Sequence, residues 1–215
     1  MAGVTSTAAE LIPPHATLPV LRRVARGCEA CDLYLRGTQT VFGEGPARAE
    51  VMLIGEQPGN DEDLAGKPFV GPAGRVLDKA LAEAGLDRSE TYLTNVVKHF
   101  KWEARGKRRI HSKPNAGEVK ACMPWLQAEF RAVQPRIVVC LGATAAQALL
   151  GRSFRVTESH GRIFSYEFAP AIVATIHPSS ILRAPDEEAR HQKMLDLTDD
   201  LKRAVHWLQQ NRRIA

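Results

Sequence analysis

Three runs of apolar residues lead into polar side chains of types that enzymes use for catalysis. Glu56 follows the apolar run 51–54, Asn95 lies near the end of a second run, and His177 directly follows a third. In an open α/β sheet, ligands bind just beyond the carboxyl ends of the parallel strands, so we expect these side chains at one edge of a sheet. There the imidazole of His177 is well placed to donate a hydrogen bond to a developing anion, with an ordinary turn as the alternative.

Glu56 and Gln57 lie in a loop that is framed by Gly55 and Gly59. Glycine lets the backbone approach a ligand closely, which favours a binding site here. The alternative is a carboxylate that caps a helix or pairs with a nearby cation, as structural ion pairs also do. The spacing matches neither the dinucleotide-binding pattern nor the P-loop pattern, because the required Lys and Ser/Thr are missing.

The four cysteines form one close pair and one distant pair: Cys28 with Cys31, then Cys122 and Cys140. Four thiolates are enough to hold a structural zinc ion or an iron–sulfur cluster. Zinc ribbons prefer two close pairs, so the spacing counts somewhat against zinc. The alternative remains that Cys122 and Cys140 are ordinary buried thiols.

A polar, basic segment covers residues 98–113 and contains the run Lys107-Arg108-Arg109-Ile110-His111. Such a segment is typical of a solvated loop or of a patch that contacts phosphates, in which His111 is one more positive group. Ile110 is the unusual residue, because an apolar side chain indicates that this end of the loop is packed.

The elements that must position these groups alternate along the chain. Apolar runs bounded by turn residues predict strands near residues 51–54, 91–97, 136–142 and 171–176. Helical spacing with capping residues or a terminal Gly predicts helices over residues 18–26, 73–84, 116–130, 144–150 and along the C-terminal segment, where Leu197, Leu201, Val205 and Leu208 mark the inner face. This alternation predicts an α/β fold, a three-layer α/β/α sandwich with a central four-stranded parallel sheet. Residues 152–170 are expected to be irregular, with room for a hairpin.

The sequence predicts one domain over residues 18–215, preceded by a flexible N-terminal segment, the lead-in, at residues 1–17. The formal net charge of +5 fits a polyanionic partner but is a weak signal by itself. No run approaches the roughly 18 apolar residues that cross a bilayer, and residues 1–19 lack the pattern of a secretion signal. We therefore expect a monomer in the bacterial cytoplasm.

Several segments together, in this order, resemble the uracil-DNA glycosylase superfamily, and specifically its iron–sulfur branch, family 4. They are Gly-Glu-Gln-Pro-Gly at 55–59, Gly-Lys-Pro-Phe-Val-Gly-Pro-Ala-Gly at 66–74, Thr-Asn at 94–95, His-Pro-Ser-Ser-Ile-Leu-Arg at 177–183, and the four cysteines. Two features depart from family 4: Gln57 stands where that family has Gly, and a basic loop ending in His111 is inserted. Both are similar to the UdgX-type glycosylases, which excise uracil and stay covalently attached to the DNA through that histidine.

The resemblance implies a role for each side chain at the strand ends. Phe69 would stack on a uracil flipped out of the DNA, and the amide of Asn95 would pair with the edge of the base. His177, with backbone N–H groups near Gln57, would stabilise the departing uracil anion. Glu56 would stabilise the oxocarbenium-like sugar and orient the group that attacks C1′.

The two departures imply that His111 is this attacking group. If Glu56 accepts a hydrogen bond from one ring nitrogen, the other nitrogen is left as a nucleophile near neutral pH. The resulting adduct has no good leaving route, so the enzyme would act once. Contacts to the flanking DNA are expected from Lys107, Arg108, Arg109, Ser179, Ser180, Leu182 and Arg183.

The resemblance also implies a structural 4Fe-4S cluster on Cys28, Cys31, Cys122 and Cys140, with zinc as the alternative. The expected partner is uracil-containing DNA, preferably single-stranded, and free uracil is the expected product. Two other functions remain open: a family 4 enzyme in which water attacks, and an iron–sulfur protein that binds DNA without cutting it.

Overall fold

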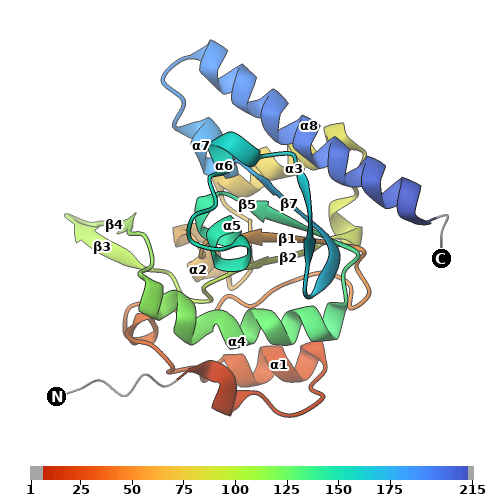
Figure 1. Cartoon of the computed structure of the whole chain (residues 1–215). Helices are drawn as coiled ribbons and strands as arrows, with labels where there is room; N and C mark the ends of the chain where they lie inside the picture. Colours follow the sequence, from red (N-terminus) through yellow and green to blue (C-terminus); the bar gives the residue numbers. More distant parts are fainter. Residues whose placement is uncertain (1–6, 213–215) are drawn as a thin grey trace.

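The computed structural model describes residues 7–212 and places one sheet between two layers of helices (Figure 1). The strands of this sheet are β1 (Val51–Gly55), β2 (Tyr92–Asn95), β5 (Ile137–Leu141), β6 (Ile163–Tyr166) and β7 (Ala169–Thr175). The helices are α1 (Leu18–Ala25), α2 (Asn60–Ala65), α3 (Pro72–Ala84), α4 (Ala116–Val133), α5 (Ala143–Leu150), α6 (Val156–Ser159), α7 (Pro178–Leu182) and α8 (Glu187–Arg212). Short 3-10 turns are η1 (Ala8–Leu11), η2 (Asp32–Leu35) and η3 (Arg88–Glu90).

The strands of the sheet lie in the order β2-β1-β5-β7-β6. The four predicted strands are present and parallel, but β6 adds a fifth strand that runs antiparallel to β7. The prediction of a purely parallel, four-stranded sheet was therefore wrong at this edge. The additional strand comes from the segment 152–170. There Phe164 and Tyr166 pack on the core and alternate with more exposed residues, as in a strand, and β6 forms a hairpin with β7.

The four parallel strands β1, β2, β5 and β7 bury side chains on both faces, which produces two cores. Met52 and Ile54 pack on the side of α1, α4 and α5, whereas Leu53 packs on the side of α3, α7 and α8. This alternation follows from the two-residue period of a strand. The predicted three-layer α/β/α arrangement is confirmed.

Local signals end the helices where the sequence predicts. Asn115 and Glu118 form the predicted capping box at the start of α4, and Gly85 ends α3 in the left-handed conformation. In α8 the buried residues include the predicted leucines, but Ala204 is buried in place of Val205. The small displacement follows from the 3.6-residue period of a helix, which brings residues 197, 201, 204 and 208 onto one face.

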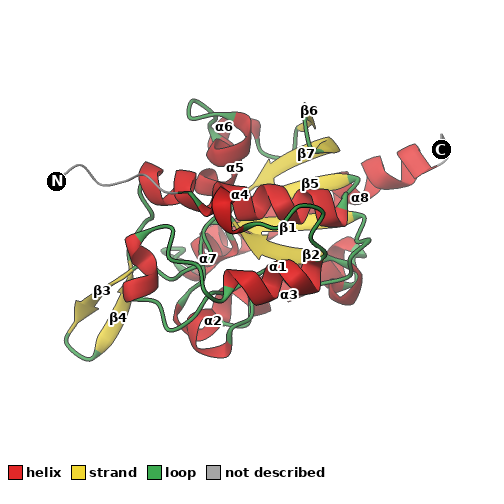
Figure 2. Cartoon of the chain, turned by 90° about the horizontal axis from the view of Figure 1, so that it is seen from below, coloured by secondary structure: helices red, strands yellow, loops and turns green. Residues whose placement is uncertain are grey.

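A two-stranded hairpin, β3 (Trp102–Arg105) and β4 (Arg108–His111), projects from the body of the molecule (Figures 1 and 2). It lies within the segment that was expected to be a polar, basic loop. Trp102 pairs with His111 in the hairpin register, so His111 lies at the base of the hairpin and not at its tip. The hairpin therefore holds His111 on ordered backbone.

Part of the predicted N-terminal lead-in is structured. Residues 1–6 lie outside the described part of the chain, but Ala8 in η1 is fully buried against the core. Across residues 7–212, none of the helices has both the length and the apolarity that a bilayer crossing needs.

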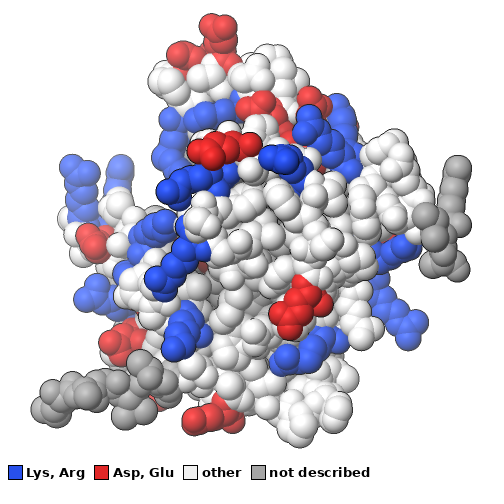
Figure 3. All heavy atoms as spheres, in the orientation of Figure 1, with Lys and Arg blue, Asp and Glu red and all other residues white. Residues whose placement is uncertain are grey.

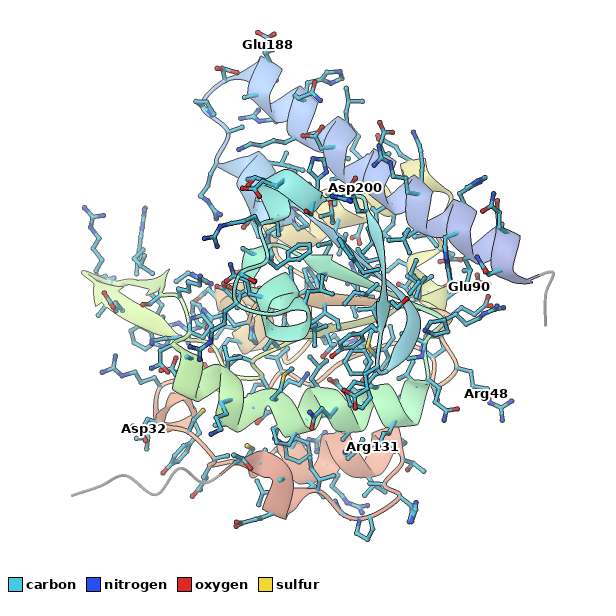
Figure 4. All side chains as sticks on the ribbon, viewed as in Figure 1. Asp32, Arg48, Glu90, Arg131, Glu188 and Asp200 are labelled. Carbon is cyan, nitrogen blue, oxygen red and sulfur yellow. The ribbon has the colours of Figure 1, made fainter. Side chains whose placement is uncertain are left out.

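Asp200 joins α8 to the carboxyl end of β7 and is labelled in Figure 4. Its Oδ2 accepts a hydrogen bond from Thr175 Oγ1 at 2.7 Å and lies 2.8 Å from His160 Nδ1. Because Thr175 is the last residue of β7, this contact fixes the strand end that leads into His177.

Candidate active site

The carboxyl ends of β1, β2 and β7 meet at a cavity of about 870 Å³. Glu56, Asn95 and His177 all line it, as the strand-end rule predicted. His111 reaches the same cavity from the hairpin, together with Ile110. Ile110 is 42% exposed and faces this cavity, so it is not packed in the interior as its apolar side chain had indicated.

Glu56 is held between the hairpin and α5. His111 Nε2 lies 3.2 Å from Glu56 Oε1, and the hydroxyl of Thr144 donates a hydrogen bond to Glu56 Oε2. Burial alone would raise the pKa of Glu56, but the hydrogen bonds from His111 and Thr144 outweigh it and lower this pKa. Glu56 is therefore an oriented carboxylate at neutral pH.

His177 is a neutral hydrogen-bond donor. Burial lowers its pKa to about 4, although the carboxylate of Glu56 acts in the opposite direction. The backbone N–H of Ser179 donates to His177 Nδ1 at 3.1 Å, so Nδ1 carries the lone pair and the proton lies on Nε2. An uncharged N–H beside the cavity can stabilise an anion that develops there.

Phe69 and Asn95 converge over Gly55 at the end of β1. A Cβ atom at Gly55 would lie 2.4 Å from Asn95 Oδ1 and 2.7 Å from Phe69 Cζ, so only glycine leaves room for both groups. The ring centroids of Phe69 and His177 are 6.4 Å apart with a tilt of 30°. The cavity thus has an aromatic wall beside an amide, which suits a planar polar ligand.

Gln57 lines the cavity, but its side-chain amide is bound to the backbone of the hairpin. Its Nε2 donates to the carbonyl oxygens of Lys101 and Ser112, both at 3.1 Å, and its Oε1 accepts from Lys101 N–H at 3.2 Å. Lys101 precedes β3 and Ser112 follows β4, so one amide joins the end of β1 to both legs of the hairpin. Any contribution of Gln57 to anion binding must therefore come from its backbone.

The basic residues of the hairpin divide into two groups. Lys107 and Arg108 are exposed near the tip, on a side of the molecule where many Lys and Arg side chains gather (Figure 3). Arg109 instead points toward α2, where its Nη1 lies 2.6 Å from Asp63 Oδ2 and its Nε donates to Asn60 at 2.9 Å. Arg109 thus makes an anchoring contact, because the fully buried Asp63 carboxylate binds its guanidinium, and its phosphate contact stays a prediction.

The segment after His177 forms α7 at the rim of the cavity. Leu182 and Arg183 line the rim, and Leu182 is 45% exposed. Ser179 is bound to His177, and its Oγ lies 2.7 Å from Nδ1. The hydroxyl of Ser180 is buried and has no hydrogen-bond partner among the described residues. The hydroxyl of Ser180 is thus turned inward, whereas Ser179, Leu182 and Arg183 line the cavity.

Three of the four cysteines lie near one another. Burial raises the pKa of Cys122 to about 12, and the charges of Cys28 and Cys31 add to this effect. The sulfur atoms of Cys122 and Cys28 accept hydrogen bonds from Lys98 N–H and Trp125 Nε1, both at 3.2 Å, as metal-bound thiolates do.

Cys140 sits inside β5, in the same apolar core as Cys28 and Cys122, and burial raises its pKa. The charges of the other cysteines, which act on Cys122, do not add to this effect. Residues 7–212 contain no group of three or more His, Cys, Asp or Glu side chains already arranged to hold a metal ion.

The sequence did not reveal two groups of the site. Thr144 follows the end of β5 by three residues and completes the set of strand ends, a position that the strand-end rule could have flagged. Lys98 carries the other missed contact: its ammonium is fully buried and binds Glu129 Oε2 at 2.5 Å, Thr94 Oγ1 at 2.6 Å and the carbonyl of Asn95 at 2.7 Å. Lys98 begins the segment that was predicted to be a basic loop, so nothing in the neighbouring sequence indicated that its side chain is buried.

Comparison with known proteins gives consistent matches. The family model described as the uracil DNA glycosylase superfamily matches residues 42–202. The chain is 35% identical over 185 residues to a type-4 uracil-DNA glycosylase of Pyrobaculum aerophilum, covering 83% of this chain and 91% of that protein. It is 33% identical to a type-4 uracil-DNA glycosylase of Thermotoga maritima (84% and 91% covered) and 35% identical to one of Archaeoglobus fulgidus (76% and 82% covered).

Proposed function

This chain belongs to the uracil-DNA glycosylase superfamily, and we propose that it excises uracil from DNA and then stays bound to the abasic site through a covalent bond from His111. The observation that carries the covalent step is the contact of 3.2 Å between His111 Nε2 and Glu56 Oε1. Glu56 is the carboxylate that faces the sugar in this proposal, so its partner imidazole stands where water would otherwise attack.

Recognition of uracil depends on Asn95 and Phe69. The amide oxygen of Asn95 accepts from uracil N3–H and its NH2 group donates to O4, while Phe69 stacks on the ring. Cytosine presents the reverse pattern of donor and acceptor. A buried polar group that is left unpaired costs about 1–3 kcal/mol, which corresponds to roughly tens- to hundredsfold discrimination.

Cleavage separates charge between the base and the sugar. The bond from C1′ to N1 breaks, and its electron pair leaves on uracil, where the neutral Nε2–H of His177 stabilises the anion. The ionised Glu56 stabilises the positive charge at C1′. Both protonation states follow from the hydrogen bonds and burial of these side chains.

The covalent step follows at the same carbon. Glu56 holds the proton of one ring nitrogen of His111, and the lone pair of the other nitrogen forms a bond to C1′. The ring proton, which the new bond makes more acidic, passes to the carboxylate of Glu56. The adduct is an N-substituted imidazole, a poor leaving group, so each molecule acts once.

A 4Fe-4S cluster, or zinc, is proposed for Cys28, Cys31, Cys122 and Cys140. The support is that the charges of Cys28 and Cys31 act on Cys122, and that the sulfur atoms of Cys28 and Cys122 accept N–H donors. Cys140, inside β5 in the same apolar core, stays a prediction as the fourth ligand. When bound, the cluster would link the segment before β1 to α4, and no step of the reaction requires an electron.

The test is a denaturing gel after incubation with uracil-containing single-stranded DNA. We expect a slowly migrating protein–DNA band that survives heating in SDS, together with one equivalent of free uracil. His111→Ser should abolish the band, whereas His206→Ser, a change at an exposed histidine of α8, should leave it intact.

The other results select the alternatives. Repeated uracil release without a band indicates that water attacks, as the similarity to type-4 enzymes favours. A complex that releases no uracil indicates a protein that binds DNA without cutting it.

A further inference from the structure

Phe69 has a backbone conformation that its residue type disfavours. Its φ is +55°, in the left-handed region, where an L-residue with a bulky side chain pays a steric cost. Such a residue persists only when its surroundings fix it. Phe69 is also the residue whose ring forms the aromatic wall of the cavity, so the strain lies at the point of base stacking.

The carbonyl group of Phe69 is held from two sides. Arg88 Nη2 donates to the carbonyl oxygen of Phe69 at 3.0 Å and to that of Pro68 at 3.3 Å. On the other side, the first turn of α3 closes on the same oxygen, and a Cβ atom at Gly74 would lie 1.9 Å from it. The Phe69 carbonyl therefore has little freedom to rotate while Arg88 is in place.

Arg88 is itself fixed at both ends. Its Nη1 forms an ion pair with Asp78 on α3. Its backbone carbonyl accepts hydrogen bonds from Thr91 Oγ1 at 2.8 Å and from Thr91 N–H at 3.2 Å, and Asp87 caps the 3-10 turn through Ser89 N–H at 2.7 Å. The guanidinium is therefore a rigid donor, suited to holding a strained peptide group.

We propose that Arg88 is a positioning residue for base recognition, which keeps Phe69 in its left-handed conformation so that the ring faces the flipped-out base. This inference rests on the proposed excision of uracil. Arg88 does not line the cavity with Glu56 and His177, so it acts through Phe69 and not on the substrate.

The test compares the affinity for two single-stranded DNAs that differ at one position. One carries 2′-fluoro-deoxyuridine, whose fluorine slows cleavage at C1′, and the other carries a stable abasic site. Stacking contributes only when a base is present, and loss of one stacked base weakens nucleic-acid binding by roughly 5- to 100-fold. We expect Arg88→Ala to weaken binding of the first DNA by about 5- to 20-fold and to leave that of the abasic DNA unchanged.

Two further variants and one control make the result specific. Arg88→Lys retains one cationic donor and should restore part of the affinity. In a Phe69→Ala background, Arg88→Ala should have no further effect, because no ring is left to position. The matched control is Arg136→Ala: Arg136 also donates to a backbone carbonyl, that of Asn211 at 2.8 Å, but far from the cavity.

An equal loss for both DNAs would overturn the inference, and so would an additive loss in the Phe69→Ala background or full affinity of the Arg88→Ala variant. Circular dichroism melting of Arg88→Ala and Arg88→Lys separates a loss of folding from a loss of positioning. Failure of the proposed function gives a different result, in which the wild-type protein shows no preference for uracil over thymine DNA.

Discussion

His111 Nε2 lies 3.2 Å from Glu56 Oε1, although the two side chains come from a hairpin and from the end of a strand in the central sheet. The contact exists because Gln57, next to Glu56 in the chain, binds both legs of that hairpin. Gln57 thus positions His111 beside Glu56.

Gln57→Ala should slow formation of the covalent adduct more than release of uracil. The change removes three hydrogen bonds that hold the hairpin base, and at about 1 kcal/mol each they allow a loss of 10-fold or more in the adduct rate. The rates are measured by quenched time courses, with the gel for the adduct and chromatography for free uracil. Gln147→Ala is the control, since Gln147 also donates to a backbone carbonyl, that of Phe154, outside the cavity. Equal losses of both rates would contradict the positioning role.

Replacing Arg109 and replacing Arg108 by Ala should affect different properties of the protein. Arg109→Ala frees the hairpin from Asp63 and should reduce the adduct yield without changing the salt dependence of DNA binding. Arg108→Ala removes an exposed cation and should reduce the slope of log Kd against log salt by about 0.7, the value for one phosphate contact on single-stranded DNA. Fluorescence anisotropy at several salt concentrations measures the slope. The reverse pattern would show that Arg109 contacts phosphate.

The strand ends could be predicted from the sequence because their signals are local. Glu56 and His177 directly follow apolar runs, and the capping box at Asn115 is a short-range pattern. Side-chain partners that are distant in the chain had no such signal: Thr144 on Glu56, and the buried Asp63 that draws Arg109 inward. The sequence allowed a hairpin within residues 152–170 but did not place β6 in the central sheet, since its half-exposed pattern is weak without its partner β7.

The low pKa of His177, about 4, makes the stability of the protein depend on pH. Between this value and the ordinary value of about 6.5, the unfolded chain binds a proton at this residue that the folded protein does not. The stabilising contribution is therefore complete above pH 6.5 and is lost as the pH falls toward 4. Urea unfolding measures this effect at pH 7 and pH 4.5. Between these pH values the free energy of unfolding should fall by about 2 kcal/mol more in the wild type than in His177→Asn. The control, His206→Asn, should behave like the wild type. An equal fall in the wild type and in His177→Asn would contradict the prediction.

Lys98 and Glu129 form a fully buried ion pair beneath Asn95, with side-chain exposures of 1% and 0%. Lys98→Met leaves the Glu129 carboxylate buried without its cation, and removal of one partner of such a pair destabilises a protein by about 3–5 kcal/mol. The double variant Lys98→Met with Glu129→Gln has no buried charge at this position, and its amide oxygen can still accept from Gly43 N–H and the Tyr92 hydroxyl, so most of the lost stability should return.

The same double variant separates stability from function. Lys98 Nζ donates to the carbonyl of Asn95 at 2.7 Å, and a Met side chain at position 98 has no donor to replace it. The end of β2 then loses a support behind the amide that we propose pairs with uracil. The DNA concentration that half-saturates single-turnover release of uracil should therefore rise by about 5- to 10-fold, the effect of one hydrogen bond of roughly 1–1.5 kcal/mol. Urea unfolding measures the stability, and single-turnover release of uracil with the DNA titrated in excess over protein measures the half-saturating concentration. A double variant as unstable as Lys98→Met alone would show that the cost is lost packing and not an unpaired charge. An unchanged half-saturating concentration would show that Asn95 is held by β2 without help from Lys98.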